Sequence, residues 1–336
     1  MSAAPVIDIH SHFLPESWPD LAARFGTPDW PWMRHSEAGK AMLMLGEKEF
    51  RPVYDACWSA SRRIEEMDRD GINLQVISAT PLLFAYDRPA AQAADCASMF
   101  NDMAREICAS GAGRLLSLCQ VPLQDTDTAC KVLSRAMQDG HVGVQIGNHV
   151  GERNLDDEGL IAFLQHCADE GAAVLVHPWD MLARERTHRY MMAWTVGMPA
   201  ETQLGIVSMI LGGAFERLPE KLRLCFAHGG GSFAFLLGRL DNAWRRRDIV
   251  RGKSTDLPSS YLRRFYVDSA VFDAAALRFL ADVMGEDRVM LGSDYPFPLG
   301  EEVVGELIRS APQFDSAAKA QLLGGNAARF LGIAKG

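Results

Sequence analysis

The sequence predicts an α/β protein built as a (β/α)8 barrel, or TIM barrel, with an insertion after the first strand. Short apolar runs alternate with helical segments, the apolar runs number eight, and glycine follows several of the helical segments. Continuous apolar runs are typical of parallel strands that are buried on both faces. A chain of 336 residues suits one barrel with insertions. We therefore expect a single domain over 1–336.

The first expected strand is Val6–His12, and a long irregular segment follows it at about residues 13–58. This segment contains five prolines and four tryptophans: Pro15, Pro19, Pro28, Pro31, Pro52, Trp18, Trp30, Trp32 and Trp58. A loop of this length in a compact domain is usually a functional insertion or lid. A peripheral decoration is the alternative.

The rest of the chain continues the alternation of strand and helix. Seven further strands are expected at 73–79, 115–122, 142–147, 173–178, 222–228, 265–269 and 288–294. Helices are expected at 61–70, 90–110, 125–139, 156–170, 200–216, 232–247, 273–284, 301–311 and 315–331. Glycine after a helix is typical of a left-handed C-cap. A doubly wound open sheet is the alternative fold, but no G-x-G-x-x-G follows the first strand to support it.

Composition and charge narrow the classes of function. With 48% hydrophobic and 23% charged residues, the chain has an ordinary globular composition. The net charge of −9 argues against nucleic acids and anionic membranes as partners. No apolar run reaches the roughly 20 residues of a membrane span, and no signal peptide is expected. Seven scattered cysteines without a Cys-x-x-Cys pair indicate a reducing, cytoplasmic location.

Histidines and an aspartate stand at the carboxyl ends of four expected strands: His10 and His12, His177, His228 and Asp294. Barrel enzymes place their active sites at this end of the strands. Residues two apart in a strand point to the same face, so the first two histidines converge. Imidazoles suit a divalent metal such as zinc. Any one of these residues alone would be read as a core or turn residue, but together they predict a metal site.

This pattern resembles the amidohydrolase superfamily, which has His-x-His after strand one, histidines after strands five and six, and aspartate after strand eight. Longer blocks are similar to the 2-amino-3-carboxymuconate-6-semialdehyde decarboxylase family within it. These blocks are 7–13, 50–54, 144–149, 175–180, 228–235 and 291–298. They are spread over the whole chain.

The resemblance implies one zinc ion per subunit, held by His10, His12, His177 and Asp294. Many superfamily members hold two metals bridged by a carboxylated lysine on strand four. This chain has Gln145 at strand four, and a neutral amide cannot form that bridge. Cobalt, manganese and iron suit the same ligands. His228 is either a further ligand or the base beside the metal-activated water, and the resemblance implies the base.

The resemblance also implies a small dianionic substrate. The expected reaction is non-oxidative decarboxylation of 2-amino-3-carboxymuconate 6-semialdehyde to 2-aminomuconate 6-semialdehyde, in tryptophan (kynurenine) or nitrobenzoate catabolism. Guanidinium groups bind carboxylates in a bidentate way, and the family pattern assigns this role to Arg51 and Arg239. It implies that Arg239 reaches the neighbouring site of a homodimer, with a salt bridge as the alternative role. Trp194 and Phe297 are candidates to line the pocket, and ordinary packing explains either equally well.

Three other functions are compatible with parts of this pattern. A related aromatic-acid decarboxylase of the resorcylate type would keep the same site. A metal-dependent amide or lactone hydrolase would also keep the metal, but a neutral substrate would not require two arginines. A non-catalytic metal-binding protein is the third, and the complete ligand set and the intact base count against it.

Overall fold

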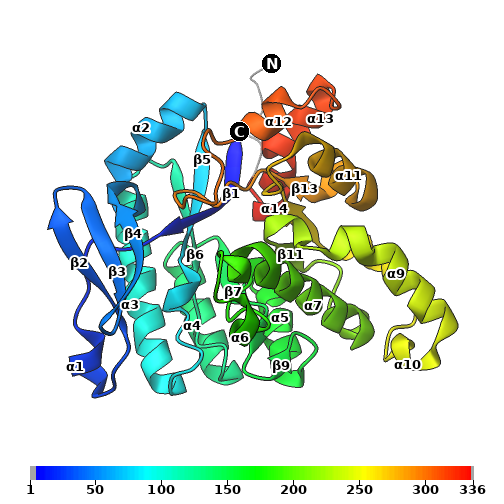
Figure 1. Ribbon diagram of the computed structural model, residues 1–336, viewed down its shortest axis with the longest axis horizontal. Helices are drawn as coiled ribbons and strands as arrows, with labels where there is room; N and C mark the ends of the chain where they lie inside the picture. Colours follow the sequence, from blue (N-terminus) through cyan, green and yellow to red (C-terminus); the bar gives the residue numbers. More distant parts are fainter. Residues whose placement is uncertain (1–4, 334–336) are drawn as a thin grey trace.

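The computed structural model describes residues 5–333, and its centre is a sheet of eight parallel strands (Figure 1). The strands, in their order across the sheet, are β1 (Ile7–Phe13), β5 (Leu74–Ala79), β6 (Leu115–Cys119), β7 (Gly143–Gly147), β10 (Ala173–His177), β11 (Arg223–Phe226), β12 (Tyr266–Asp268) and β13 (Val289–Met290). Their apolar residues are buried almost throughout. The predicted α/β class with eight parallel strands is confirmed.

The sheet curls until its first strand lies beside the segment that follows its last strand. The amide of Ile9 donates a hydrogen bond to the carbonyl of Leu291 over 3.0 Å, and the amide of His12 donates to the carbonyl of Tyr295 over 2.7 Å. Ser11 and Tyr295 form a parallel bridge. This contact brings the carboxyl end of β1 next to the residues after β13.

Helices follow most of the strands and pack their apolar faces on the sheet. The longer ones are α2 (Ala60–Asp70), α3 (Ala90–Ala109), α4 (Thr126–Gln138), α5 (Glu158–Asp169), α7 (Met198–Leu211), α9 (Phe233–Arg246) and α11 (Ala274–Met284). Acidic side chains cap several of them: Asp125 accepts from the Thr128 amide over 2.9 Å, and Asp273 from the Ala276 amide over 2.9 Å. Such caps satisfy amides that a helix leaves free at its start.

The remaining elements are short. They are α1 (Leu21–Phe25), α6 (Arg184–Thr187), α8 (Ala214–Arg217), α10 (Asp248–Arg251), α12 (Glu306–Ser310), α13 (Ser316–Ala320), α14 (Asn326–Leu331), the strands β8 (His149–Val150) and β9 (Arg153–Asn154), and the 3-10 or π turns η1 (Asp55–Cys57), η2 (Pro81–Leu83), η3 (Ala193–Gly197), η4 (His228–Gly230), η5 (Pro258–Arg264), η6 (Glu286–Arg288) and η7 (Gln321–Gly325). Among the described residues no helix has the length and apolarity needed to cross a membrane.

The prediction of an irregular segment at 13–58 is wrong. The chain forms α1 and then a three-stranded antiparallel sheet of β2 (Pro31–Glu37), β3 (Lys40–Leu45) and β4 (Lys48–Tyr54). Its turns contain Gly39 and Gly46, both with positive φ. Pro31 begins a strand and Pro52 lies in an edge strand, two places where a sheet tolerates proline. Figure 1 shows this outer sheet on the opposite side of the molecule from α9 and α10.

Other element boundaries also differ from the prediction, and the helix expected at 315–331 is divided into α13, η7 and α14. The expected helix at 200–216 breaks into α7 and α8, because Gly213 takes the left-handed conformation. The last strand stops at Met290, and the chain turns at Asp294, which also has positive φ. The helix expected from residue 301 begins only at Glu306, since Glu301 caps the turn by accepting from the amides of Gly305 and Leu307.

Candidate metal centre

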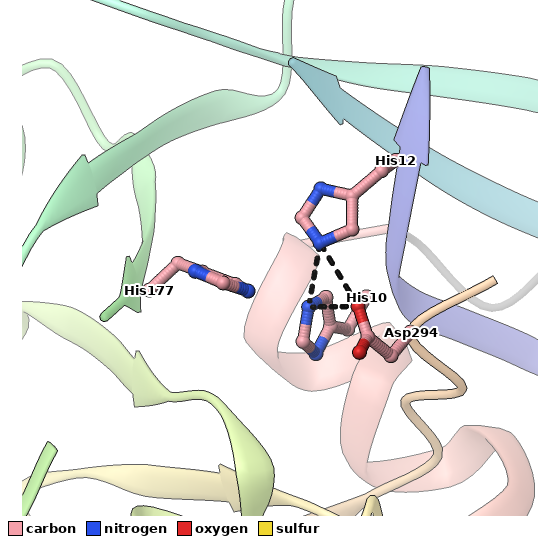
Figure 2. A group of neighbouring side chains, drawn as sticks. All are labelled: His10, His12, His177 and Asp294. Atoms are coloured by element: carbon pink, nitrogen blue, oxygen red, sulfur yellow. Dashed lines mark hydrogen bonds and ion pairs between the residues drawn. The ribbon is translucent and has the colours of Figure 1, made fainter. Parts of the chain in front are cut away.

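Two imidazoles face each other at the carboxyl end of β1. His10 and His12 are buried, and their Nε2 atoms lie 3.2 Å apart. The alternation of side chains along a strand places both rings on the inside of the curled sheet. Figure 2 shows the two nitrogens pointing toward a common point. Two ring nitrogens at this distance are well placed to share one cation.

A carboxylate approaches the same point from the turn after β13. Oδ1 of Asp294 lies 3.1 Å from Nε2 of His12 and 3.6 Å from Nε2 of His10. Burial raises the pKa of Asp294, but the neighbouring rings of His12, His228 and His10 lower it by a larger amount, so the net pKa lies well below the ordinary value. The carboxylate is therefore ionised and offers an oxygen ligand.

A third imidazole completes the group from across the sheet (Figure 2). His177 is the last residue of β10, and its Nδ1 lies 2.8 Å from the carbonyl oxygen of Pro178. This contact leaves Nε2 as the free nitrogen, and Nε2 is buried without a hydrogen-bond partner among the described residues. One ligand atom from each of His10, His12, His177 and Asp294 lies within 4.8 Å of the others.

The protonation of the ring nitrogens suits a metal. Asp268, at the end of β12, accepts from Nδ1 of His10 over 2.7 Å, so Nε2 is the nitrogen left to bind a cation. Burial lowers the pKa of His12 to about 4 and holds the pKa of His177 well below its ordinary value. Both rings are therefore neutral, as a metal ligand requires. An orphaned buried nitrogen and three converging neighbours fit a divalent ion.

His228 stands beside this group without belonging to it. Its ring centroid lies 5.1 Å from that of His10 and 4.9 Å from that of His177, and its Nε2 lies 3.7 Å from Oδ2 of Asp294. Both ring nitrogens are buried and have no hydrogen-bond partner in the described part of the chain. The backbone amide of His228 donates to Asp268 over 3.0 Å. This ring can accept or release a proton next to the group.

One arginine from the outer sheet reaches the edge of the site. The guanidinium of Arg51, on β4, lies 4.4 Å from the centroid of the Phe297 ring, which is 5.4 Å from the ring of His12. Burial lowers the pKa of Arg51, and the charge of Asp294 raises it in part. Arg51 and Phe297 therefore lie together beside the histidine group.

Comparison with known proteins identifies the family. The family described as Amidohydrolase matches residues 7–333. The chain belongs to the amidohydrolase family. The 2-amino-3-carboxymuconate-6-semialdehyde decarboxylase of Dictyostelium discoideum is 43% identical over 97% of this chain and 91% of its own length. The enzyme of the same name from Caenorhabditis elegans is 31% identical over 97% and 94%. The chain is thus a member of this decarboxylase family, as predicted, and it is an enzyme.

Solved structures share the fold of this amidohydrolase. The IDCase of Metarhizium anisopliae in its apo form superposes with a TM-score of 0.83 at 25% identity, and the match covers 97% of both chains. A dihydroxybenzoic acid decarboxylase of Polaromonas sp., solved with manganese and 2-nitroresorcinol, gives a TM-score of 0.79 at 19% identity over 99% of this chain and 98% of its own. This chain therefore has the same overall fold as these solved structures.

Gln145 occupies the middle of β7 in this family member. Its amide accepts from the hydroxyl of Ser78 over 2.6 Å and donates to the carbonyl of Ala79 over 2.7 Å. Both the oxygen and the nitrogen of this amide are thus hydrogen-bonded to residues of β5. Within residues 5–333 there is one group of metal-ligating side chains, and Gln145 is not part of it.

Two of the predicted site residues do not reach the group. Arg239 is exposed on α9, which projects from the body of the amidohydrolase (Figure 1). Trp194 is half-buried in η3. In the described chain, neither side chain forms a hydrogen bond, ion pair or ring contact with the histidine group.

The sequence interpretation missed three charged residues around the group. Asp268 ends an expected strand, so the rule that selected His177 could have selected it as well. Asp8 is buried on β1 and accepts from the amides of His10 and Ser293. Arg63 lies on α2, is fully buried and donates to the carbonyl of His12. A charged residue in a helix usually faces solvent, so the sequence offered no signal for Arg63.

Proposed function

We propose that this enzyme decarboxylates 2-amino-3-carboxymuconate 6-semialdehyde without an oxidant, releasing CO2 and 2-aminomuconate 6-semialdehyde. The observation that carries the proposal is the group of three imidazoles and one carboxylate at the carboxyl ends of β1, β10 and β13. Its support from relatives is the 43% identity to a decarboxylase named for this substrate. The pathway we assign is tryptophan (kynurenine) or nitrobenzoate catabolism.

The metal we assign is one zinc ion per subunit, held by His10, His12, His177 and Asp294. Three nitrogen ligands and one oxygen ligand suit zinc and leave a position open for water. When bound, such an ion acts as a Lewis acid and lowers the pKa of its water to about 7. The single ligand group and the hydrogen-bonded amide of Gln145 support one ion rather than two.

The side chains around the ligands transfer the proton and bind the substrate. His228 has two free ring nitrogens and serves as the base that takes and returns a proton beside Asp294. Arg51 binds a substrate carboxylate through its guanidinium and orients it. The bond that breaks joins this carboxylate to the carbon skeleton, and a proton replaces the CO2 that leaves. Phe297 packs under Arg51 and excludes water from that side.

The active unit we propose is a homodimer in which Arg239 binds substrate in the neighbouring subunit and Trp194 helps to line the pocket. Arg239 is exposed, and on the same projecting arm Phe235 is 79% and Ile249 is 84% exposed. Burial of these two side chains against a second subunit would support this arrangement. Each chain acts as one domain, with residues 13–58 as the insertion that supplies Arg51. All seven cysteines are free thiols, which suits the reducing cytoplasm.

The assay that tests this function uses substrate made from 3-hydroxyanthranilate by enzymatic ring opening. Zinc-loaded protein is expected to remove the ultraviolet absorption band of the substrate and to release CO2 in equal amount. A parallel assay with 2,6-dihydroxybenzoate tests the resorcylate-type alternative. Metal-replete protein that leaves the first substrate unchanged would contradict the proposal, and turnover of 2,6-dihydroxybenzoate alone would replace it with the alternative.

A further inference from the structure

Arg63 is a fully buried cation directly below the candidate metal centre. It lies on α2, and its guanidinium points into the curled sheet. Nη2 donates to the carbonyl oxygen of His12, and Nη1 donates to Oε1 of Gln75 over 2.8 Å and to the hydroxyl of Ser11 over 3.3 Å. Three of its contacts therefore end on or beside the strand that carries two of the four ligands.

The same guanidinium also touches the segment that carries the fourth ligand. Its carbon lies 5.0 Å from the centroid of the Tyr295 ring, and Tyr295 directly follows Asp294. The carbonyl of Tyr295 in turn accepts from the amide of His12 over 2.7 Å. Arg63 thus contacts both β1 and the segment after β13 that is hydrogen-bonded to it.

Arg63 is linked to the carboxyl group of Asp8 through one intervening amide. Gln75 accepts from Arg63 and donates to Oδ2 of Asp8 over 3.0 Å. Asp8 also accepts from the amide of His10 over 3.2 Å and from the hydroxyl of Ser293 over 2.7 Å. Arg63, Gln75 and Asp8 therefore form a polar layer, and both ligand-bearing segments are hydrogen-bonded to it.

Stability alone does not account for a charge in this position. Burying a guanidinium without a direct carboxylate partner is costly, and an apolar side chain of similar size would fill the same space. No carboxylate lies within ion-pair distance of Arg63 among residues 5–333. We propose that Arg63 is a positioning residue of the metal centre, which holds His12 and Asp294 at the spacing that a metal requires. This inference rests on the proposed metal centre and assigns it a residue outside the ligand set.

Arg264 provides a matched control. Its guanidinium donates to the carbonyls of Phe215 and Leu218 over 2.6 and 2.7 Å and lies 5.4 Å from the Phe215 ring. These are the same kinds of contact that Arg63 makes. Arg264 precedes β12, however, so it lies at the opposite end of the strand from Asp268 and the metal centre.

The experiment compares Arg63→Met, Arg63→Lys and Arg264→Met as metal-free proteins. The zinc dissociation constant is measured by competition with a chromophoric chelator, and the visible spectrum is recorded with cobalt in place of zinc. Residues behind metal ligands typically change metal affinity by roughly 10- to 100-fold. Arg63→Met is expected to weaken zinc binding by this factor and to alter the cobalt bands, Arg63→Lys to recover part of both, and Arg264→Met to keep both while it lowers the melting temperature.

Each outcome decides between defined claims. A folded Arg63→Met protein with wild-type zinc affinity and cobalt bands would overturn the inference and leave the proposed function intact. A wild-type protein that binds no divalent metal would overturn the proposed metal centre as well. If Arg63→Met does not fold, Gln75→Met decides: it removes the link between Arg63 and Asp8, and it is expected to weaken zinc binding about tenfold. Unchanged affinity and spectrum in that variant would contradict the inference.

Discussion

The proposed metal ligands and the proposed substrate ligands come from different parts of the molecule. His10 and His177 are buried at the ends of central strands, and each has its Nδ1 within hydrogen-bond distance of a fixed oxygen. Arg51 comes from the outer sheet, and Arg239 from an exposed helix. In the proposed function, the central sheet therefore holds the metal, whereas the outer elements supply the charges that bind a substrate. The two tasks are expected to respond separately to substitution.

The largest effect should follow from removing a ligand of the central sheet. His177→Ala deletes one of four ligands, so the protein is expected to lose bound zinc and all measurable decarboxylation. Metal content by atomic emission and the ultraviolet assay measure both. His166→Ala is the matched control, because His166 is a helical residue beside Ser134 and its loss should leave zinc content unchanged. Full zinc occupancy in His177→Ala would contradict the ligand assignment.

A substitution in the outer sheet should reduce activity and spare the metal. Arg51→Lys keeps the positive charge but cannot form a bidentate contact with a carboxylate. Hydrogen bonds to charged groups contribute about 1.5–3 kcal/mol, so kcat/KM should fall by roughly 10- to 150-fold. Zinc content should remain at the wild-type value. Arg34→Lys, at an exposed ion pair with Glu49 in the same sheet, should behave like the wild type.

The comparison can be sharpened further by separating the two substrate arginines between subunits. Arg51→Ala and Arg239→Ala homodimers are both expected to be nearly inactive. Their mixture, after dissociation and reassociation, contains hybrid dimers with one intact and one doubly altered site. In a two-fold symmetric dimer, random mixing should then restore about a quarter of the wild-type activity. An Arg239→Ala protein with wild-type activity, or a mixture without recovery, would contradict the shared site.

The smallest effect concerns protons released when zinc binds. Burial lowers the pKa of His10. The hydrogen bond and ion pair with Asp268 raise it by a larger amount, so the net pKa lies above the ordinary value. Burial lowers the pKa of His12 to about 4, and also lowers that of His177. At pH 6, therefore, His10 carries a proton and the other two rings do not. Zinc binding should release about one proton.

Calorimetric titrations in buffers of different ionisation enthalpy count these protons. The number should fall toward zero as the pH rises through the pKa of His10, and zinc affinity should weaken about tenfold per pH unit below that pKa. The loss should not steepen until the pH approaches 4, where His12 begins to accept a proton. Release of two or three protons at pH 6 would show that the buried rings titrate normally.

The sequence predicted the central sheet, and it predicted four residues that the structure brings together, because one rule applies to both. Continuous apolar runs marked the strands, and the residue types at their carboxyl ends marked His10, His12, His177 and Asp294, which the structure brings together. The same rule reached Asp268 but did not select it, because one carboxylate after a strand is common. The outer sheet was missed because Pro31 and Pro52 resemble loop residues, although they occupy a strand start and an edge strand. Arg63 could not be found, since its burial depends on α2 packing against β1.

The hydrogen bonds between β1 and the residues after β13 have a consequence for biosynthesis. The amide of Ser293 donates to Asp8, which is 285 residues earlier in the chain, and the amide of Asp294 donates to the carbonyl of His10 over 2.9 Å. A ribosome must therefore translate the chain as far as Asp294 before the four proposed ligands can meet. Contacts of such long sequence separation form late and slow folding. A nascent chain thus exposes His10 and His12 long before Asp294 is made, and the proposed coordination site is complete only when the last strand is in place.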